Sequence, residues 1–223
     1  MKISLDVERE RETERVDFDV MMLLCGGWSG RDRQEILRHA EELRHLGVEP
    51  PEKFPIIFPV SRYLLTGGDE VEVISTETSG EVEYVAFADR DVFISVGSDH
   101  TDRSIEGISI EKAKQSCPKV VAQKAWAYQD VKDHWDELVV KSYAYSQGKR
   151  LLYQEAALSS LITVETLLAH VDRERFGDKG LVLFSGTVPL LTKNFIYADE
   201  FEVEMSDPRL NRRMSHRYRV KVL

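Results

Sequence analysis

Residues Thr78–Arg103 read TSGEVEYVAFADRDVFISVGSDHTDR, and this stretch decides the expected fold. Apolar residues alternate with other residues around Glu81 and Glu83, which is typical of a β-strand. The two glutamates share one face of that strand, while the other face carries Val82, Tyr84, Ala86 and Ala88. Two carboxylates that lie two residues apart on one strand are close enough to converge on a single ion.

A second strand, Val92–Asp99, follows after Asp89, Arg90 and Asp91. If these three residues form the loop of a hairpin, Asp99 lies opposite Glu81 on the same face, whereas a two-residue loop would put it on the wrong face. Three adjacent carboxylates repel one another, so a hard cation such as Mg2+, Mn2+ or Ca2+ is their natural partner. The set contains neither cysteine nor histidine, which argues against a zinc site.

Two interpretations of the glutamate pair compete. Glutamates that alternate along a strand usually form the solvated face of a half-exposed sheet. The polar run from Gly97 to Arg103 favours a site instead, because binding and catalytic residues concentrate where strands end in loops.

Composition limits the classes of function. The chain has 223 residues, with 39 acidic against 30 basic residues and a net charge of -9, which disfavours a nucleic-acid partner. A small-molecule substrate is expected. Two cysteines outside any CxxC pair fit a reducing compartment, and no signal peptide or membrane-length apolar run is present, so we expect a cytoplasmic protein without a membrane partner. Its size predicts one domain over residues 1–223.

The flanking segments supply further candidates. Residues 1–20 predict an N-terminal hairpin, and residues 26–47 predict a glycine loop followed by a helix over Arg31–Leu46. The first turn of that helix carries Asp32, Arg33 and Glu35, which suits either an active-site lid or a simply solvated helix end.

Two more segments carry candidate polar groups. Lys124 stands among apolar residues and is either partly buried beside an anion or at a strand edge with its ammonium in water. The run Gly180–Leu191 predicts a buried strand that ends in the turn Ser185, Gly186 and Thr187, whose backbone N–H groups could bind an anion.

The order of these motifs resembles the fumarylacetoacetate hydrolase superfamily, in a branch where GSDHTDR and FSGTVP recur, over Phe18–Glu204. The resemblance implies an α+β, strand-dominated fold, a mixed β-sandwich roll with a few peripheral helices, and a homodimer. It also implies metal ligands at Glu81, Glu83 and Asp99. Lys124 is implied as a catalytic lysine beside the metal that stabilises developing negative charge. Substrate contacts are expected from Arg103, Arg33, Gly186 and Thr187.

The implied function is a divalent-metal-dependent hydrolase or lyase. Such an enzyme acts on a small 2-oxo acid or 1,3-dicarbonyl compound by C–C bond hydrolysis, decarboxylation or hydration and dehydration. This chain departs from relatives that carry a histidine and a glutamate on the lid helix, since the matching positions hold Asp32 and Glu35. A carboxylate pair can activate water but offers no imidazole, so a catalytically inactive module that binds small acids is the alternative.

Overall fold

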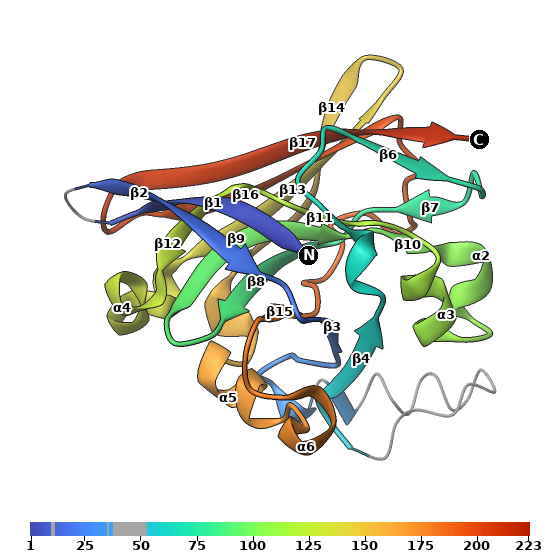
Figure 1. Ribbon diagram of the computed structural model, residues 1–223. Coiled ribbons are helices and arrows are strands. Elements are labelled where there is room, and N and C mark those ends of the chain that lie inside the picture. The colour runs from blue at the N-terminus through green and yellow to red at the C-terminus, as the bar shows by residue number, and fades with distance from the viewer. Residues whose placement is uncertain (10–11, 35, 38–52) are drawn as a thin grey trace.

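The computed structural model describes residues 1–9, 12–34, 36–37 and 53–223 (Figure 1). Strands are the main secondary structure of this part of the chain, as expected, and they form two main sheets and one two-stranded ribbon. The ribbon pairs β7 (Thr78–Ser79) with β10 (Thr101–Asp102). No helix in the described ranges is long and apolar enough to cross a membrane.

The larger sheet has ten strands and mixes parallel and antiparallel pairs. Its order is β2-β1-β12-β9-β8-β15-β3-β4, with β11 joining β9 to β5. The strands are β1 (Lys2–Glu8), β2 (Thr13–Asp19), β3 (Met22–Gly27), β4 (Ile56–Val60), β5 (Leu65–Thr66), β8 (Val82–Ala88), β9 (Val92–Asp99), β11 (Lys119–Val121), β12 (Lys124–Ala127) and β15 (Leu181–Phe184).

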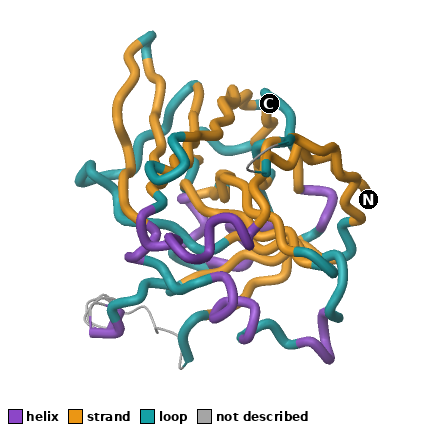
Figure 2. Tube along the Cα trace, turned by 90° about the vertical axis from the view of Figure 1, so that its left-hand side faces the viewer, coloured by secondary structure: helices purple, strands orange, loops and turns teal. Residues whose placement is uncertain are grey.

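The smaller sheet has five strands in the order β14-β13-β16-β17-β6. They are β6 (Glu70–Val73), β13 (Val139–Ser146), β14 (Lys149–Ala157), β16 (Glu200–Asp207) and β17 (Arg212–Val222). Alternate residues of β13 and β16 are buried, so one face packs inward while the other faces water, the usual pattern of an antiparallel sandwich sheet. Figure 2 shows the trace turned by 90°.

The helices are short and lie at the periphery (Figure 1). They are α2 (Arg103–Glu106), α3 (Ile110–Gln115), α4 (Tyr128–Val131), α5 (Val164–Ala169) and α6 (Arg173–Phe176), with 3-10 turns η1 (Arg62–Leu64), η2 (Lys132–Glu137) and η3 (Leu158–Ser160). The helix predicted over Arg31–Leu46 is helical at residues 33–34 and 36–37. Arg31 and Asp32 precede the helical residues, and Glu35 and residues 38–46 lie outside the described residues.

Three buried clusters fill the interior, and the two larger ones lie on opposite faces of the ten-stranded sheet. The first lies between the two sheets and joins Tyr84 and Ile94 to Val203 and Met205. The second is enclosed by the larger sheet itself, because residues from its two opposite edges, Phe18 and Val60 among them, belong to one cluster. The larger sheet therefore curls into a roll, which confirms the expected β-sandwich roll. The single-domain assignment stays a prediction.

The β8–β9 hairpin lies in the middle of the roll and is buried on both faces. All seven residues of β8 are buried, and Ala88 pairs with Val92, so Asp89, Arg90 and Asp91 form the predicted three-residue loop. The face of Val82 and Tyr84 packs between the sheets, while the face of the glutamates continues into Val85 and Phe87 inside the roll. The glutamates thus stand at one end of the roll interior.

A substitution at Gly97 of β9 would probe how tightly this hairpin packs. A Cβ at Gly97 would lie 2.6 Å from the Val120 carbonyl oxygen, 2.7 Å from the Phe184 ring and 2.8 Å from a Val85 methyl group. We expect Gly97→Ala to lower the free energy of unfolding by about 1–3 kcal/mol, the usual cost of overpacking a core. Gly107→Ala is the matched control, because no atom lies within 4 Å of its Cβ position. Urea unfolding of both variants checks this, and equal effects would contradict the packing.

Candidate metal centre

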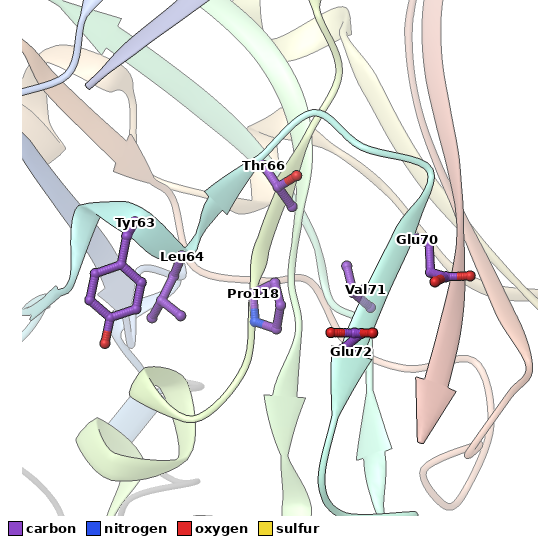
Figure 3. Close-up of a pocket in the computed structure, with 7 residues that line it drawn as sticks. All are labelled: Tyr63, Leu64, Thr66, Glu70, Val71, Glu72 and Pro118. Atoms are coloured by element: carbon purple, nitrogen blue, oxygen red, sulfur yellow. The ribbon is translucent and has the colours of Figure 1, made fainter. Parts of the chain in front are cut away.

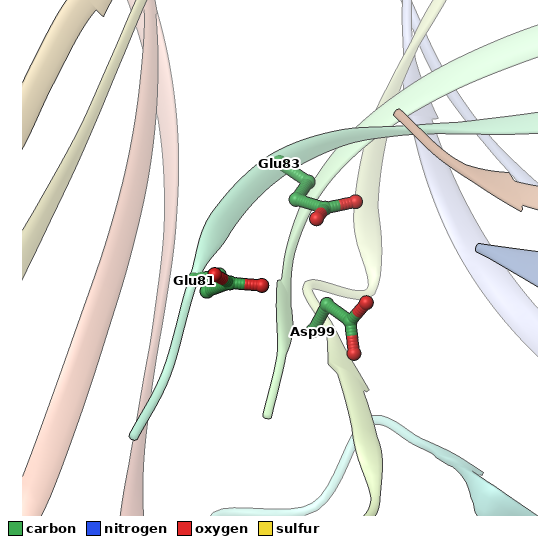
Figure 4. A group of neighbouring side chains, drawn as sticks. All are labelled: Glu81, Glu83 and Asp99. Carbon is green, nitrogen blue, oxygen red and sulfur yellow. The ribbon is translucent and has the colours of Figure 1, made fainter. Parts of the chain in front are cut away.

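Glu81, Glu83 and Asp99 converge at the end of the roll. One ligand oxygen from each lies within 4.8 Å of the other two, and Figure 4 shows the three carboxylates close together. The hairpin register produces this arrangement: Glu83 pairs with Gly97, and the Asp99 N–H donates to the Glu81 carbonyl at 3.0 Å. The predicted placement of Asp99 opposite Glu81 is therefore confirmed. We call these three residues the acidic triad.

The acidic triad is not a solvated face. Glu83 and Asp99 are fully buried, and the Glu81 side chain is 13% exposed. Burying a carboxylate without a partner is strongly unfavourable, so each member must be balanced by a cation, a hydrogen bond or a proton. The interpretation of the glutamates as the wet side of a half-exposed sheet is wrong, because β8 has the roll interior on one side and the second sheet on the other.

Asp99 carries an ammonium on each oxygen. Lys119 Nζ lies 2.7 Å from Oδ1, and Lys114 Nζ lies 2.5 Å from Oδ2. Burial by itself would raise the pKa of Asp99, but the two positive charges and their hydrogen bonds outweigh it and hold the pKa well below its ordinary value. Asp99 is therefore ionised throughout the physiological range.

Glu83 is balanced much less completely. Its Oε2 accepts the Gly186 N–H at 2.8 Å, while its Oε1 is buried and has no hydrogen-bond partner among the described residues. Burial raises the pKa of Glu83 well above its ordinary value, and the Asp99 charge raises it further against the opposing effect of Lys114. An orphaned, buried carboxylate oxygen beside two other carboxylates fits a hard divalent cation, since Mg2+, Mn2+ and Ca2+ prefer oxygen ligands.

Glu81 is held by Arg103, whose guanidinium has several fixed partners. Arg103 NH2 lies 3.1 Å from Glu81 Oε1, Nε donates to Ser79 Oγ at 2.7 Å, and NH1 donates to Glu106 at 2.8 Å. The Phe195 ring lies 4.3 Å from the guanidinium carbon. Burial disfavours the charge, but Glu81 and Glu106 raise the pKa of Arg103 above its ordinary value. Arg103 therefore orients a triad member as well as contributing positive charge.

Comparisons with known proteins identify the family of this chain and solved structures that share its fold. Residues 26–218 match the family model DUF2848, described as a protein of unknown function. The chain belongs to the DUF2848 family. No curated protein matches its sequence.

Solved structures similar to this DUF2848 chain share its fold at low identity. A 2-keto-3-deoxy-D-arabinonate dehydratase complexed with magnesium and 2,5-dioxopentanoate has a TM-score of 0.65 and 15% identity, over 92% of this chain and 74% of that one. A fumarylacetoacetate hydrolase from Exiguobacterium antarcticum has 0.58 and 15%, over 95% and 82%. A 4-oxalocrotonate decarboxylase from Pseudomonas putida G7, complexed with calcium and acetate, has 0.53 and 14%, over 92% and 78%. The fold is that of the fumarylacetoacetate hydrolase superfamily.

Lys124 does not lie where it was expected. Its ammonium pairs with Glu8 and donates to the Arg213 carbonyl, and its side chain is 41% exposed. Its own carbonyl accepts from Ser95, four residues before Asp99 on β9, so Lys124 lies well along the strand from the acidic triad. The expected position beside the metal is wrong, and Lys114 and Lys119 are the lysines that contact the triad.

Sequence reasoning missed these two lysines, although a signal existed for one of them. Lys119 pairs directly with Asp99 in the β9–β11 ladder, and Lys119 directly follows the Cys117–Pro118 turn. Because β11 and β12 run antiparallel to β9 and Lys119 lies opposite Asp99, Lys124, which comes five residues later, lies well along β9 from Asp99. An apolar neighbourhood around Lys124 could not reveal which lysine faces Asp99.

Gly186 contacts the triad directly, and Thr187 contacts the backbone between its two glutamates. Gly186 has φ +86 and donates its N–H to Glu83, and a Cβ there would lie 2.3 Å from Ser29 Oγ. Only glycine suits that left-handed backbone and close contact. The Thr187 hydroxyl donates its single proton to the Val82 carbonyl at 2.9 Å, so in this arrangement the hydroxyl cannot also donate to a ligand. Whether either residue contacts a substrate stays a prediction.

The lid residues are only partly described. Asp32 is exposed, and its carboxylate accepts the Gln34 N–H at 2.8 Å, which is the capping contact of a helix start. Arg33 is exposed in the first turn. Glu35 lies outside the described residues. Catalytic roles for Asp32 and Glu35 and a substrate contact for Arg33 stay predictions.

The surface grooves lie apart from the acidic triad. One has a volume of about 410 Å³ and is lined by Tyr63, Leu64, Thr66, Glu70, Val71, Glu72 and Pro118 (Figure 3). No triad residue lines it, and its two glutamates are ion-paired at the surface, Glu70 with Arg219 and Glu72 with Lys221. We therefore place the candidate site at the triad, where charges are buried and converge.

The raised pKa of Glu83 predicts an unusual pH dependence in a chelator. The unfolded chain releases this proton near pH 4.5, while the folded protein keeps it to higher pH, so the free energy of unfolding falls as pH rises from there through the folded pKa. We expect Glu83→Gln to remove that fall. Urea unfolding in EDTA between pH 5 and pH 9 measures it, and parallel curves for parent and variant would contradict the assignment.

Asp99 is expected to behave in the opposite way. Asp99→Asn leaves Lys114 and Lys119 buried without their common counter-charge, and breaking such a pair costs about 3–5 kcal/mol. We therefore expect this variant to be strongly destabilised in EDTA, whereas Glu83→Gln is at least as stable as the parent at pH 8. Chemical unfolding of both variants side by side checks the contrast, and an Asp99→Asn protein of parental stability would refute it.

Proposed function

We propose that this chain is a divalent-metal-dependent enzyme that acts on a small 2-oxo acid or 1,3-dicarbonyl compound. The observation that carries the proposal is the buried Glu83 oxygen that has no hydrogen-bond partner in the described part of the chain and lies next to Glu81 and Asp99. Glu81, Glu83 and Asp99 would hold Mg2+, Mn2+ or Ca2+. A bound metal of this kind supplies Lewis acidity, which polarises a carbonyl and stabilises developing negative charge on oxygen.

The charge around the triad supports an anionic substrate. Four carboxylates (Glu81, Glu83, Asp99 and Glu106) face three cations (Arg103, Lys114 and Lys119), which leaves one net negative charge. A divalent ion would change this to one net positive charge. A monoanionic 2-oxo acid restores neutrality, and buried sites favour such balance because unpaired charge in them is costly.

Lys119 is the residue best placed to stabilise negative charge on a ligand. Its ammonium is fully buried and uses two protons, one on Asp99 Oδ1 and one on the His100 carbonyl, each at 2.7 Å. An ammonium has three donors, so one remains for an oxygen of a bound oxo acid. Lys119 takes over the role that the sequence assigned to Lys124.

The similar structures support the substrate class. They include a dehydratase complexed with magnesium and 2,5-dioxopentanoate, and a decarboxylase complexed with calcium and acetate. These enzymes carry out different reactions on one fold, so the choice between hydrolysis, decarboxylation and hydration or dehydration rests on residues outside the triad. Assembly as a homodimer also stays a prediction.

Titration calorimetry with Mn2+ and Mg2+, and with the enolate mimic oxalate, tests the proposal. We expect one divalent ion per chain and oxalate binding that requires the ion. Glu83→Gln should weaken metal binding by about 100-fold, since even residues that only support metal ligands contribute 10- to 100-fold. Glu111→Gln is the control, because it makes the same charge change at an exposed position.

Two other outcomes would redirect the conclusion. Folded parent protein that binds neither ion nor oxalate, or that binds the ion as well after Glu83→Gln, excludes a metal centre at the triad. Binding of ion and oxalate without turnover of any 2-oxo acid or sugar-acid lactone in a broad panel supports the inactive small-acid-binding module instead.

A further inference from the structure

Each oxygen of Asp99 already contacts an ammonium. Lys119 lies at Oδ1 and Lys114 lies at Oδ2, at 2.7 and 2.5 Å. A carboxylate oxygen can accept a hydrogen bond and ligate a cation at once, so an ammonium must move only if it fills the space between the triad oxygens. The two lysines are held in different ways, and this difference indicates which ammonium a metal ion would displace.

Lys119 is fixed in place by the sheet. It lies on β11 directly across from Asp99, its side chain is fully buried, and a second hydrogen bond ties its ammonium to the His100 carbonyl. Neither of its two acceptors involves Glu81 or Glu83. Lys119 can therefore stay on Asp99 Oδ1 while another cation approaches from the side of the glutamates.

Lys114 lies between the metal ligands themselves. Its ammonium is 2.5 Å from Asp99 Oδ2 and 3.7 Å from Glu81 Oε2, so it bridges two of the three triad residues. It extends from α3, a helix of six residues outside the sheets, and its side chain is 6% exposed. A divalent cation bound at about 2.0–2.6 Å from the same two oxygens would occupy the space of this ammonium.

We propose that Lys114 is an internal competitor of the metal: its ammonium occupies the cation position of the acidic triad and is displaced when a divalent ion binds. This inference rests on the proposed function, because it takes the triad to be the metal site. The apparent metal affinity is then set by the difference between two binding free energies, that of the divalent ion and that of the Lys114 ammonium for the same carboxylates. The lysine keeps the buried triad balanced in the metal-free protein and weakens binding of the ion.

The test removes the ammonium while keeping the bulk of the side chain. Lys114→Met and Lys114→Gln are compared with the parent and with Lys112→Met, which removes the same charge from an exposed position on the same helix. Titration calorimetry with Mn2+ and Mg2+ gives the dissociation constants, and circular dichroism verifies folding. We expect both Lys114 variants to bind the ions about tenfold more tightly or better, because a like charge within about 4 Å is removed, and Lys112→Met to change little.

Unchanged or weaker binding in the folded Lys114 variants overturns the inference. If neither variant folds, amine acetylation of the parent followed by mass spectrometry decides: Mg2+ should raise labelling of Lys114 and leave Lys112 unchanged, and no rise at Lys114 refutes displacement. Glu83→Gln distinguishes a failure of the proposed metal site from a failure of the proposed Lys114 displacement. Parent protein that binds no ion, or binds it equally after Glu83→Gln, refutes the proposed function, whereas triad-dependent binding that Lys114 does not weaken refutes this inference alone.

Discussion

The charge balance at Asp99 is the constraint on which the end of the roll depends. A fully buried carboxylate is held by one ammonium from a β-strand and another from a short helix, at 2.7 and 2.5 Å. Buried ion pairs add little stability compared with apolar packing, and they become very unfavourable when one partner is missing. The position of α3 beside β9 and β11 is therefore tied to the ionisation of a single aspartate.

Most of the GSDHTDR segment builds the surroundings of that aspartate. The Ser98 hydroxyl pairs with the Tyr218 hydroxyl at 2.7 Å and accepts the Glu81 N–H at 3.2 Å. His100 is buried between Tyr218 and Thr78, and burial, helped by Lys119 and Arg103, lowers its pKa to about 3. It is neutral at pH 7 and serves as a hydrogen-bonding spacer. Asp102 caps α2 through the Ser104 N–H at 2.9 Å. One residue of the segment, Asp99, belongs to the triad, and Arg103 orients another member.

The sequence predicted local pairing well and long-range placement less well. A three-residue loop and strict alternation were enough to place Asp99 opposite Glu81, because hairpin register depends only on nearby residues. The burial of the glutamate face could not be read from alternation, since it depends on the sheet curling around its own face. The lysine at the site was misplaced for a similar reason: the register between β9 and β11 puts Lys119 opposite Asp99 and therefore puts Lys124 well along β9, and no local pattern around Lys124 reveals that register.

A cluster of buried charges that nearly cancel stabilises a fold poorly. The proposed ligand gives these charged residues a role that stability alone does not. The residual negative charge resides on the triad, where Glu83 has one oxygen bound by a backbone N–H and the other without a hydrogen-bond partner among the described residues. Protonation of Glu83 relieves this imbalance in the metal-free protein. The proposed divalent ion would relieve it with a surplus of one positive charge as long as the Lys114 ammonium, once off the triad oxygens, stays within the cluster. That surplus would favour an anion at the proposed site. The arrangement would then link two binding steps through charge alone, since the cation creates the electrostatic condition under which a small acid binds.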